Sequence, residues 1–125
     1  MTRASDPAAP TPAQLDAAAL ARLQALDPEG RHGVVRRVLA TYEGALTRQL
    51  DQLRAERDTP TAALANLAHT LKSSSASVGA LALADACAAL EQRLRHGAVA
   101  QTHDVAHLVD LGEAALAAVR TMLRQ

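Results

Sequence analysis

The sequence contains no phenylalanine or tryptophan, and only one tyrosine and one cysteine among its 125 residues. A lone cysteine cannot form an internal disulfide framework, which favours a reducing compartment. The near absence of aromatic residues excludes the stacking surfaces with which proteins bind single-stranded nucleic acids. Thirteen basic and thirteen acidic residues give a formal charge of zero, so we expect no nucleic-acid partner.

Long apolar runs and targeting signals are also missing. The longest apolar stretches are far too short to span a bilayer. Near the N-terminus, Arg3 is followed by Ala, Ser, Asp and Pro instead of the apolar core of a signal peptide. We therefore expect no membrane contact and a cytoplasmic location. Residues 1–10 are interpreted as a flexible lead-in and residues 11–125 as one domain.

Apolar residues make up 49% of the chain, and nearly all of them are Ala, Leu and Val. Ala and Leu at this density favour helix, so the composition predicts an all-α fold. Short loops between long helices favour an up-down-up-down four-helix bundle with a short extra N-terminal helix. Apolar periodicity and helix-end signals predict five helices. The first runs from Thr11-Pro12 to residue 26 and the second over about 33–57. The third is capped by Thr59 or Thr61 and ends near Val78, the fourth ends at His96-Gly97, and the fifth is capped by Thr102 or Asp104.

The third predicted helix carries a histidine on the side away from the core. On a helical wheel of about 100° per residue, His69 lies about 140° from Leu64 and outside the apolar stripe. An exposed imidazole is largely neutral at neutral pH and can act as a nucleophile. The residues that define the stripe are Leu64, Leu67, Ala68, Leu71, Ser75 and Val78.

Small side chains and one cation surround His69 on the same side of this helix. Ala65, Ser73 and Ala76 lie one or two turns away, so a second protein could approach the ring closely. Lys72, one turn along, could offset the charge of an incoming phosphoryl group. It is the only lysine in the chain, beside twelve arginines.

Residues 68–80, which read AHTLKSSSASVGA, resemble the signature of histidine-containing phosphotransfer (Hpt) domains. In that signature the phosphorylated histidine is followed by x-Leu-Lys-Gly/Ser, a run of small residues and Gly-Ala. Ser73 stands where many members have Gly. Downstream, Leu83, Cys87, Leu90 and Glu91 are similar to the Leu-x3-Cys-x2-Leu-Glu pattern of the following helix.

The resemblance implies a phosphorelay intermediate that is not itself an enzyme. His69 would accept a phosphoryl group from, and return it to, the aspartates of response-regulator receiver domains, with Lys72 assisting. Ala65, Ser73 and Ala76 would form the partner-binding face. The chain has no Walker loop and no Gly-rich ATP lid, so we expect no kinase site and no cofactor of its own, with Mg²⁺ on the partner receiver. We also expect a monomer, because no long apolar seam remains after the bundle forms.

Two other classes of function remain open at this stage. One is a helical-bundle adaptor that binds partners by the same face without phosphorylation. The other is a metal-binding bundle enzyme, but the one Glu-x-x-His spacing, Glu29 and His32, falls in an expected loop. His103, His107 and Asp110 share a face opposite the apolar stripe of the last helix, where solvated residues are expected rather than ligands. Cys87 and Tyr42 are interpreted as core residues, with the tyrosine hydroxyl at the edge.

Overall fold

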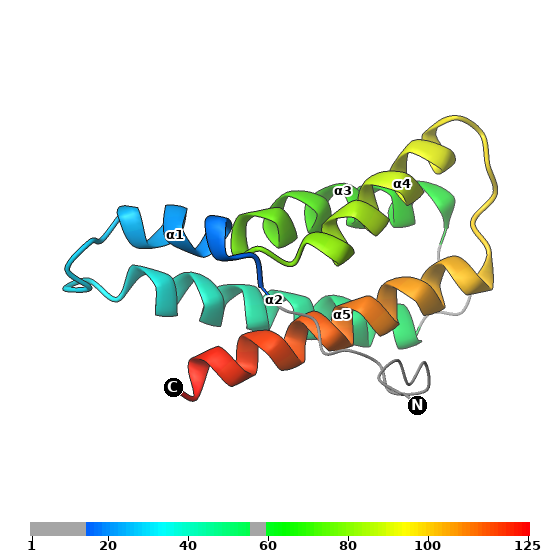
Figure 1. Cartoon of the computed structure of the whole chain (residues 1–125). Coiled ribbons are helices and arrows are strands. Elements are labelled where there is room, and N and C mark those ends of the chain that lie inside the picture. The colour runs from blue at the N-terminus through cyan, green and yellow to red at the C-terminus, as the bar shows by residue number, and fades with distance from the viewer. Residues whose placement is uncertain (1–14, 56–59) are drawn as a thin grey trace, which may run out of the picture.

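The computed structural model describes residues 15–55 and 60–125. This part of the chain contains five helices and no strand, which confirms the predicted all-α class (Figure 1). The predicted end of the second helix at Arg57 and the predicted Thr59 cap lie outside the described residues. The first helix begins at Ala17, after the N-cap Asp16, and not at Thr11-Pro12 as predicted, because Leu15 and Asp16 are not helical. The helices are α1 (Ala17–Ala25), α2 (Val34–Ala55), α3 (Thr61–Val78), α4 (Leu81–Arg95) and α5 (Thr102–Leu123).

Helices α2 to α5 form an up-down-up-down bundle, as predicted (Figure 1). Within it, α3 packs along α4 and α2 packs along α5, while α1 contacts α2 and α3 near one end. The core is built almost entirely from Leu and Ala, and each fully buried Leu contributes about 1.5–3 kcal/mol. Its largest fully buried apolar side chains are Leu46, Leu50, Leu64, Leu71, Leu83, Leu108, Val78 and Val119.

One polar pair lies inside this core. The Tyr42 hydroxyl is 2.8 Å from the Ser75 hydroxyl of α3, and both residues are buried. The prediction that the tyrosine hydroxyl lies at the edge of the bundle was wrong, because Ser75 supplies a partner for it in the interior. Burial raises the pKa of Tyr42, so this hydroxyl stays protonated.

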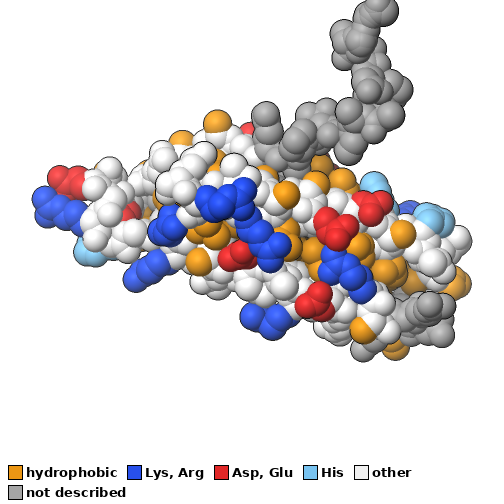
Figure 2. Space-filling model, turned by 90° about the horizontal axis from the view of Figure 1, so that it is seen from below, with side chains coloured by type: hydrophobic (Ala, Val, Ile, Leu, Met, Phe, Trp, Pro, Cys, Tyr) orange, Lys and Arg blue, Asp and Glu red, His pale blue; other side chains and the backbone are white. Residues whose placement is uncertain are grey.

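Charged side chains of both signs are scattered over the side of the bundle that Figure 2 shows. Figure 2 shows acidic side chains beside basic ones on this face. One such pair joins α5 to α2, with Arg120 Nε 2.8 Å from Glu43 Oε2. Exposed pairs of this kind contribute about 0–1 kcal/mol each, so apolar burial carries most of the stability.

Side-chain hydrogen bonds at the N-termini of α1 and α5 explain where these helices start. Asp16 caps α1, because its side chain accepts a hydrogen bond from the Ala19 amide at 3.0 Å. At the start of α5, Gln101 is the N-cap and Asp104 accepts from the Gln101 amide at 3.0 Å. The N-cap of α5 is therefore Gln101, and not Thr102 or Asp104 as predicted, although the Asp104 side chain takes part in the cap from the third helical position. Thr61 is the first residue of α3 and not its cap.

Gly79 forms the turn between α3 and α4. Its φ of +86° is in the left-handed region, and the Ala80 amide donates back to the Ser75 carbonyl at 2.8 Å, which ends α3. The Gly79 carbonyl accepts from the Asp16 amide at 2.9 Å, which ties α1 to this turn. A Cβ on Gly79 would lie 2.5 Å from the Asp16 nitrogen, so no other residue fits without movement.

We expect Gly79→Ala to destabilise the protein more than Gly97→Ala. Both glycines have positive φ, for which a side chain costs about 1–2 kcal/mol. A Cβ at Gly97 would meet nothing within 4 Å, whereas at Gly79 it would also clash with Asp16. Urea unfolding followed by circular dichroism would measure both losses, and equal losses would show that the close approach of α1 is unimportant.

Candidate functional site

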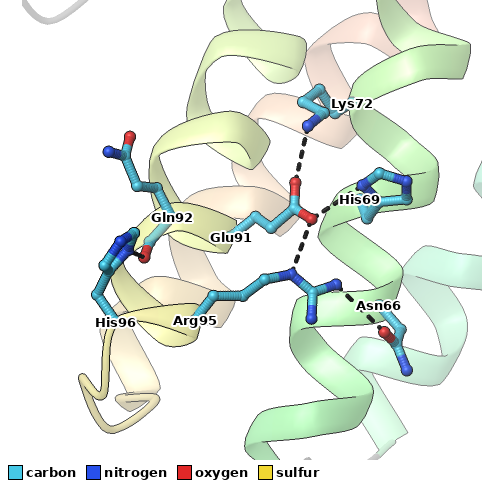
Figure 3. Close-up of polar contacts among 7 residues, drawn as sticks. All are labelled: Asn66, His69, Lys72, Glu91, Gln92, Arg95 and His96. Carbon is cyan, nitrogen blue, oxygen red and sulfur yellow. Dashed lines mark hydrogen bonds and ion pairs between the residues drawn. The ribbon is translucent and has the colours of Figure 1, made fainter.

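His69 lies in the middle of α3 with its side chain 59% exposed, as the wheel predicts. Its Nδ1 atom is 2.9 Å from Oε2 of Glu91, which projects from α4 toward the ring (Figure 3). Within the described part of the chain, the other ring nitrogen, Nε2, has no hydrogen-bond partner. The histidine is thus held at one nitrogen and open at the other.

Glu91 is the centre of this site. Only 11% of its side chain is exposed, yet it accepts three hydrogen bonds from α3 and α4 (Figure 3). Lys72 Nζ donates to Oε1 at 2.8 Å, and Arg95 Nε donates to Oε2 at 3.0 Å, beside the contact with His69. A nearly buried carboxylate with three donors is fixed in position.

The surrounding donors keep Glu91 ionised. The hydrogen bond from Lys72 is the largest cause that lowers the pKa of Glu91, and the hydrogen bond from Arg95 and the charge of His69 lower it further. Although burial acts in the opposite direction, the pKa falls to about 2. A carboxylate can only accept hydrogen bonds, so Nδ1 of His69 must be the donor. When the ring is neutral, its free lone pair is therefore on Nε2.

Lys72 and Arg95 make the surroundings of the ring cationic. Both side chains are partly exposed, at 37% and 49%, and both are bound to Glu91. Arg95 also reaches α3, where Nη2 lies 3.4 Å from Asn66 Oδ1. Two cations and one carboxylate leave about one net positive charge beside a neutral His69, which suits an anionic group arriving at Nε2.

The predicted partner-binding face is exposed at two of its three positions. Ser73 and Ala76 are exposed on α3, as expected. Ala65 is only 3% exposed and belongs to the core, so its assignment to this face was wrong. A helical wheel assumes that only one face of α3 is buried. In the structure α3 packs along α4 as well as against α2, so a wider part of its circumference is buried.

Glu91 and Arg95 belong to the site, although neither was predicted to. Glu91 was visible in the Leu-x3-Cys-x2-Leu-Glu pattern, but nothing in that pattern says which way its side chain points. Arg95 follows one turn later, so the i, i+4 spacing of Glu and Arg on α4 was the available signal.

The other chemically interesting residues lie elsewhere. His103, His107 and Asp110 are exposed along α5, and His32 and Glu29 lie in the loop before α2. No group of three or more His, Cys, Asp or Glu able to hold a metal ion occurs among residues 15–55 and 60–125. Cys87 is a buried core residue as predicted, and burial raises the pKa of its thiol to about 12. In the same ranges, no helix is both long and apolar enough to cross a membrane.

Comparison with known proteins agrees with this geometry. The profile of the Hpt domain family matches residues 35–125. The chain is also similar to the crystal structure of histidine-containing phosphotransfer protein B (HptB) from Pseudomonas aeruginosa, with 28% sequence identity and a TM-score of 0.69. That match covers 92% of this chain and 95% of the solved chain. No curated protein matches the sequence.

The lowered pKa of Glu91 predicts how stability depends on pH. A carboxyl group whose pKa is depressed on folding contributes stability above its unfolded value of about 4.5, and loses it as pH falls toward about 2. The stability advantage of the wild type over Glu91→Gln should therefore be full above about pH 5 and shrink as pH falls. Urea unfolding of both proteins across this range would measure the difference, and a constant difference would show that the carboxylate is not stabilised in the folded state.

Proposed function

Because the chain belongs to the Hpt domain family of histidine phosphotransfer intermediates in phosphorelays, we propose that His69 is the residue that carries its phosphoryl group. The observation that supports this most directly is the hydrogen bond between Nδ1 and Glu91. It leaves Nε2 as the nucleophilic atom on an exposed ring.

The reaction needs no proton transfer at Nε2. The Nε2 lone pair attacks the phosphorus of an aspartyl phosphate on a receiver domain, in line with the bond that breaks. An N–P bond forms, the P–O bond to the aspartate breaks, and its electron pair returns to the aspartate as a carboxylate. The reverse sequence returns the phosphoryl group to a receiver.

Lys72 and Arg95 supply the electrostatic part of this site. Their charges exceed that of Glu91 by one, so they favour the approach of an anionic phosphoryl group. The receiver would bring Mg²⁺ for the remaining charge stabilisation, which leaves this chain without a cofactor or ATP chemistry of its own. The phosphoryl group then enters and leaves only through partner proteins.

The exposed face around His69 is the proposed docking surface for receivers. Ser73 and Ala76 are small and exposed, so a partner can approach the ring without displacing a large side chain. We also propose that the protein is monomeric and acts in the cytoplasm. The second point is supported by the single cysteine, Cys87, which is a core residue with no disulfide partner.

The first test of this proposal is His69→Gln, which we expect to abolish phosphoryl acceptance from a phosphorylated receiver. Because the side chain is mostly exposed, the fold should persist, with a stability loss of about 1 kcal/mol from the lost contact with Glu91. Acid-labile, base-stable labelling measures acceptance, and circular dichroism checks the fold. His107→Gln, at an exposed histidine of α5, is the matched control. Normal labelling of the His69 variant would show that the phosphoacceptor lies elsewhere.

A second pair of variants separates chemistry from docking. Lys72→Ala should slow transfer by roughly tenfold but leave it detectable, because the lysine adds to stabilisation that the receiver provides. Ser73→Trp should instead raise the half-saturating receiver concentration, because position 73 is exposed one turn from His69. Transfer rates measured against receiver concentration distinguish a lower plateau from weaker binding. Normal saturation of the Trp variant would show that receivers do not approach over this face.

A further inference from the structure

We propose that Glu91 is a positioning residue that keeps the proton on Nδ1 of His69 while the phosphoryl group is attached to Nε2. This inference rests on the proposed function of His69 and adds a role in the second half of the relay. It concerns how readily the phosphorylated protein gives the group away. The geometry that supports it is the fixed carboxylate on the side of the ring opposite to the reacting nitrogen.

Glu91 cannot easily turn away from the ring. Its side chain is 11% exposed and is held at Oε1 by Lys72 and at Oε2 by Arg95. Oε2 therefore stays within hydrogen-bond distance of Nδ1 whether or not Nε2 carries a substituent. An ionised carboxylate that orients an imidazole through Nδ1 also stabilises positive charge on that ring.

Phosphorylation places such a charge on the ring. When the Nε2 lone pair forms the N–P bond and Nδ1 keeps its proton, the ring becomes cationic, as an imidazolium does. The carboxylate of Glu91, 2.9 Å from Nδ1, offsets this charge directly. No atom of the ring has to release a proton for the forward step to finish.

The proton on Nδ1 decides how easily the group leaves. If Nδ1 is protonated, breaking the N–P bond returns its electron pair to Nε2 and releases a neutral imidazole. If the proton has been lost to water, the same step must expel an imidazolate anion, which is a far poorer leaving group. By holding the proton on Nδ1, Glu91 keeps the N–P bond easy to break, so the phosphorylated protein donates its phosphoryl group rapidly.

The charged groups bound to Glu91 do not cancel this effect. Lys72, from the same helix as His69, and Arg95, from α4, both oppose a proton on the ring. The attached phosphoryl group brings nearly two negative charges, which offset those two cations. The carboxylate is then left to interact with the ring cation.

The experiment compares wild type, Glu91→Gln and Asp85→Asn. Asp85 is exposed on the same helix, so its variant removes one negative charge away from the site. Each protein is phosphorylated with phosphoramidate, a small donor that requires no receiver, and the label is mapped to a residue. The rate of label loss, and of transfer to an unphosphorylated receiver, is then measured between about pH 5 and pH 9, the range in which histidine rings usually titrate.

We expect both rates to fall as pH rises, and to fall earlier in Glu91→Gln. The midpoint of its profile should lie about one pH unit or more below that of the wild type, the usual effect of an opposite charge within about 4–6 Å. Gln can still accept a hydrogen bond from Nδ1 but carries no charge, so this variant isolates the charge. Asp85→Asn should follow the wild type.

Two results would overturn the inference. Superimposable profiles for wild type and Glu91→Gln, or equal shifts in both variants, would show that the Glu91 carboxylate does not hold the proton. Circular dichroism confirms that each variant is folded under the conditions used. A wild-type label that maps to a residue other than His69 would overturn the proposed function itself, which this design reports separately.

Discussion

The close packing of α3 against α4 is the contact on which the site depends. The two helices pack along each other and both contribute small buried residues, among them Ala68 and Ala84, and Gly79 turns the chain so that α4 returns along α3. Only at this distance can a glutamate of one helix reach a histidine of the other. A larger side chain in this interface would separate Glu91 from His69 while leaving both residues in place on their own helices.

The carboxylate of Glu91 illustrates what an ionised group in such a site adds besides stability. Moving a charge out of water is costly, and here three donors from two helices offset that cost. What the ionised group adds is a defined ring orientation and a defined location for one proton, and both are properties of the reaction.

Helices and their order could be predicted from the sequence because apolar spacing is a local signal, and the exposure of His69 followed from the same wheel. Interactions between helices could not. Ala65 was assigned to the surface because a wheel assumes one packing direction, and the Tyr42 hydroxyl was placed at the edge because its partner, Ser75, lies on another helix. Glu91 was seen in a motif but given no role, since the direction of its side chain depends on how α4 lies beside α3.

The hydrogen bond between Asp16 and Gly79 ties the α3–α4 turn to a segment that lies outside the match to the family profile. The family match begins at residue 35, after α1, yet the α3–α4 turn uses the backbone just before α1 as its neighbour. Ala19 of α1 is 1% exposed, so this helix also closes part of the interior. The profile match and the contacts of the fold therefore have different N-terminal boundaries. A fragment cut where the similarity starts would keep every residue of the site and lose the support of the turn that aligns it.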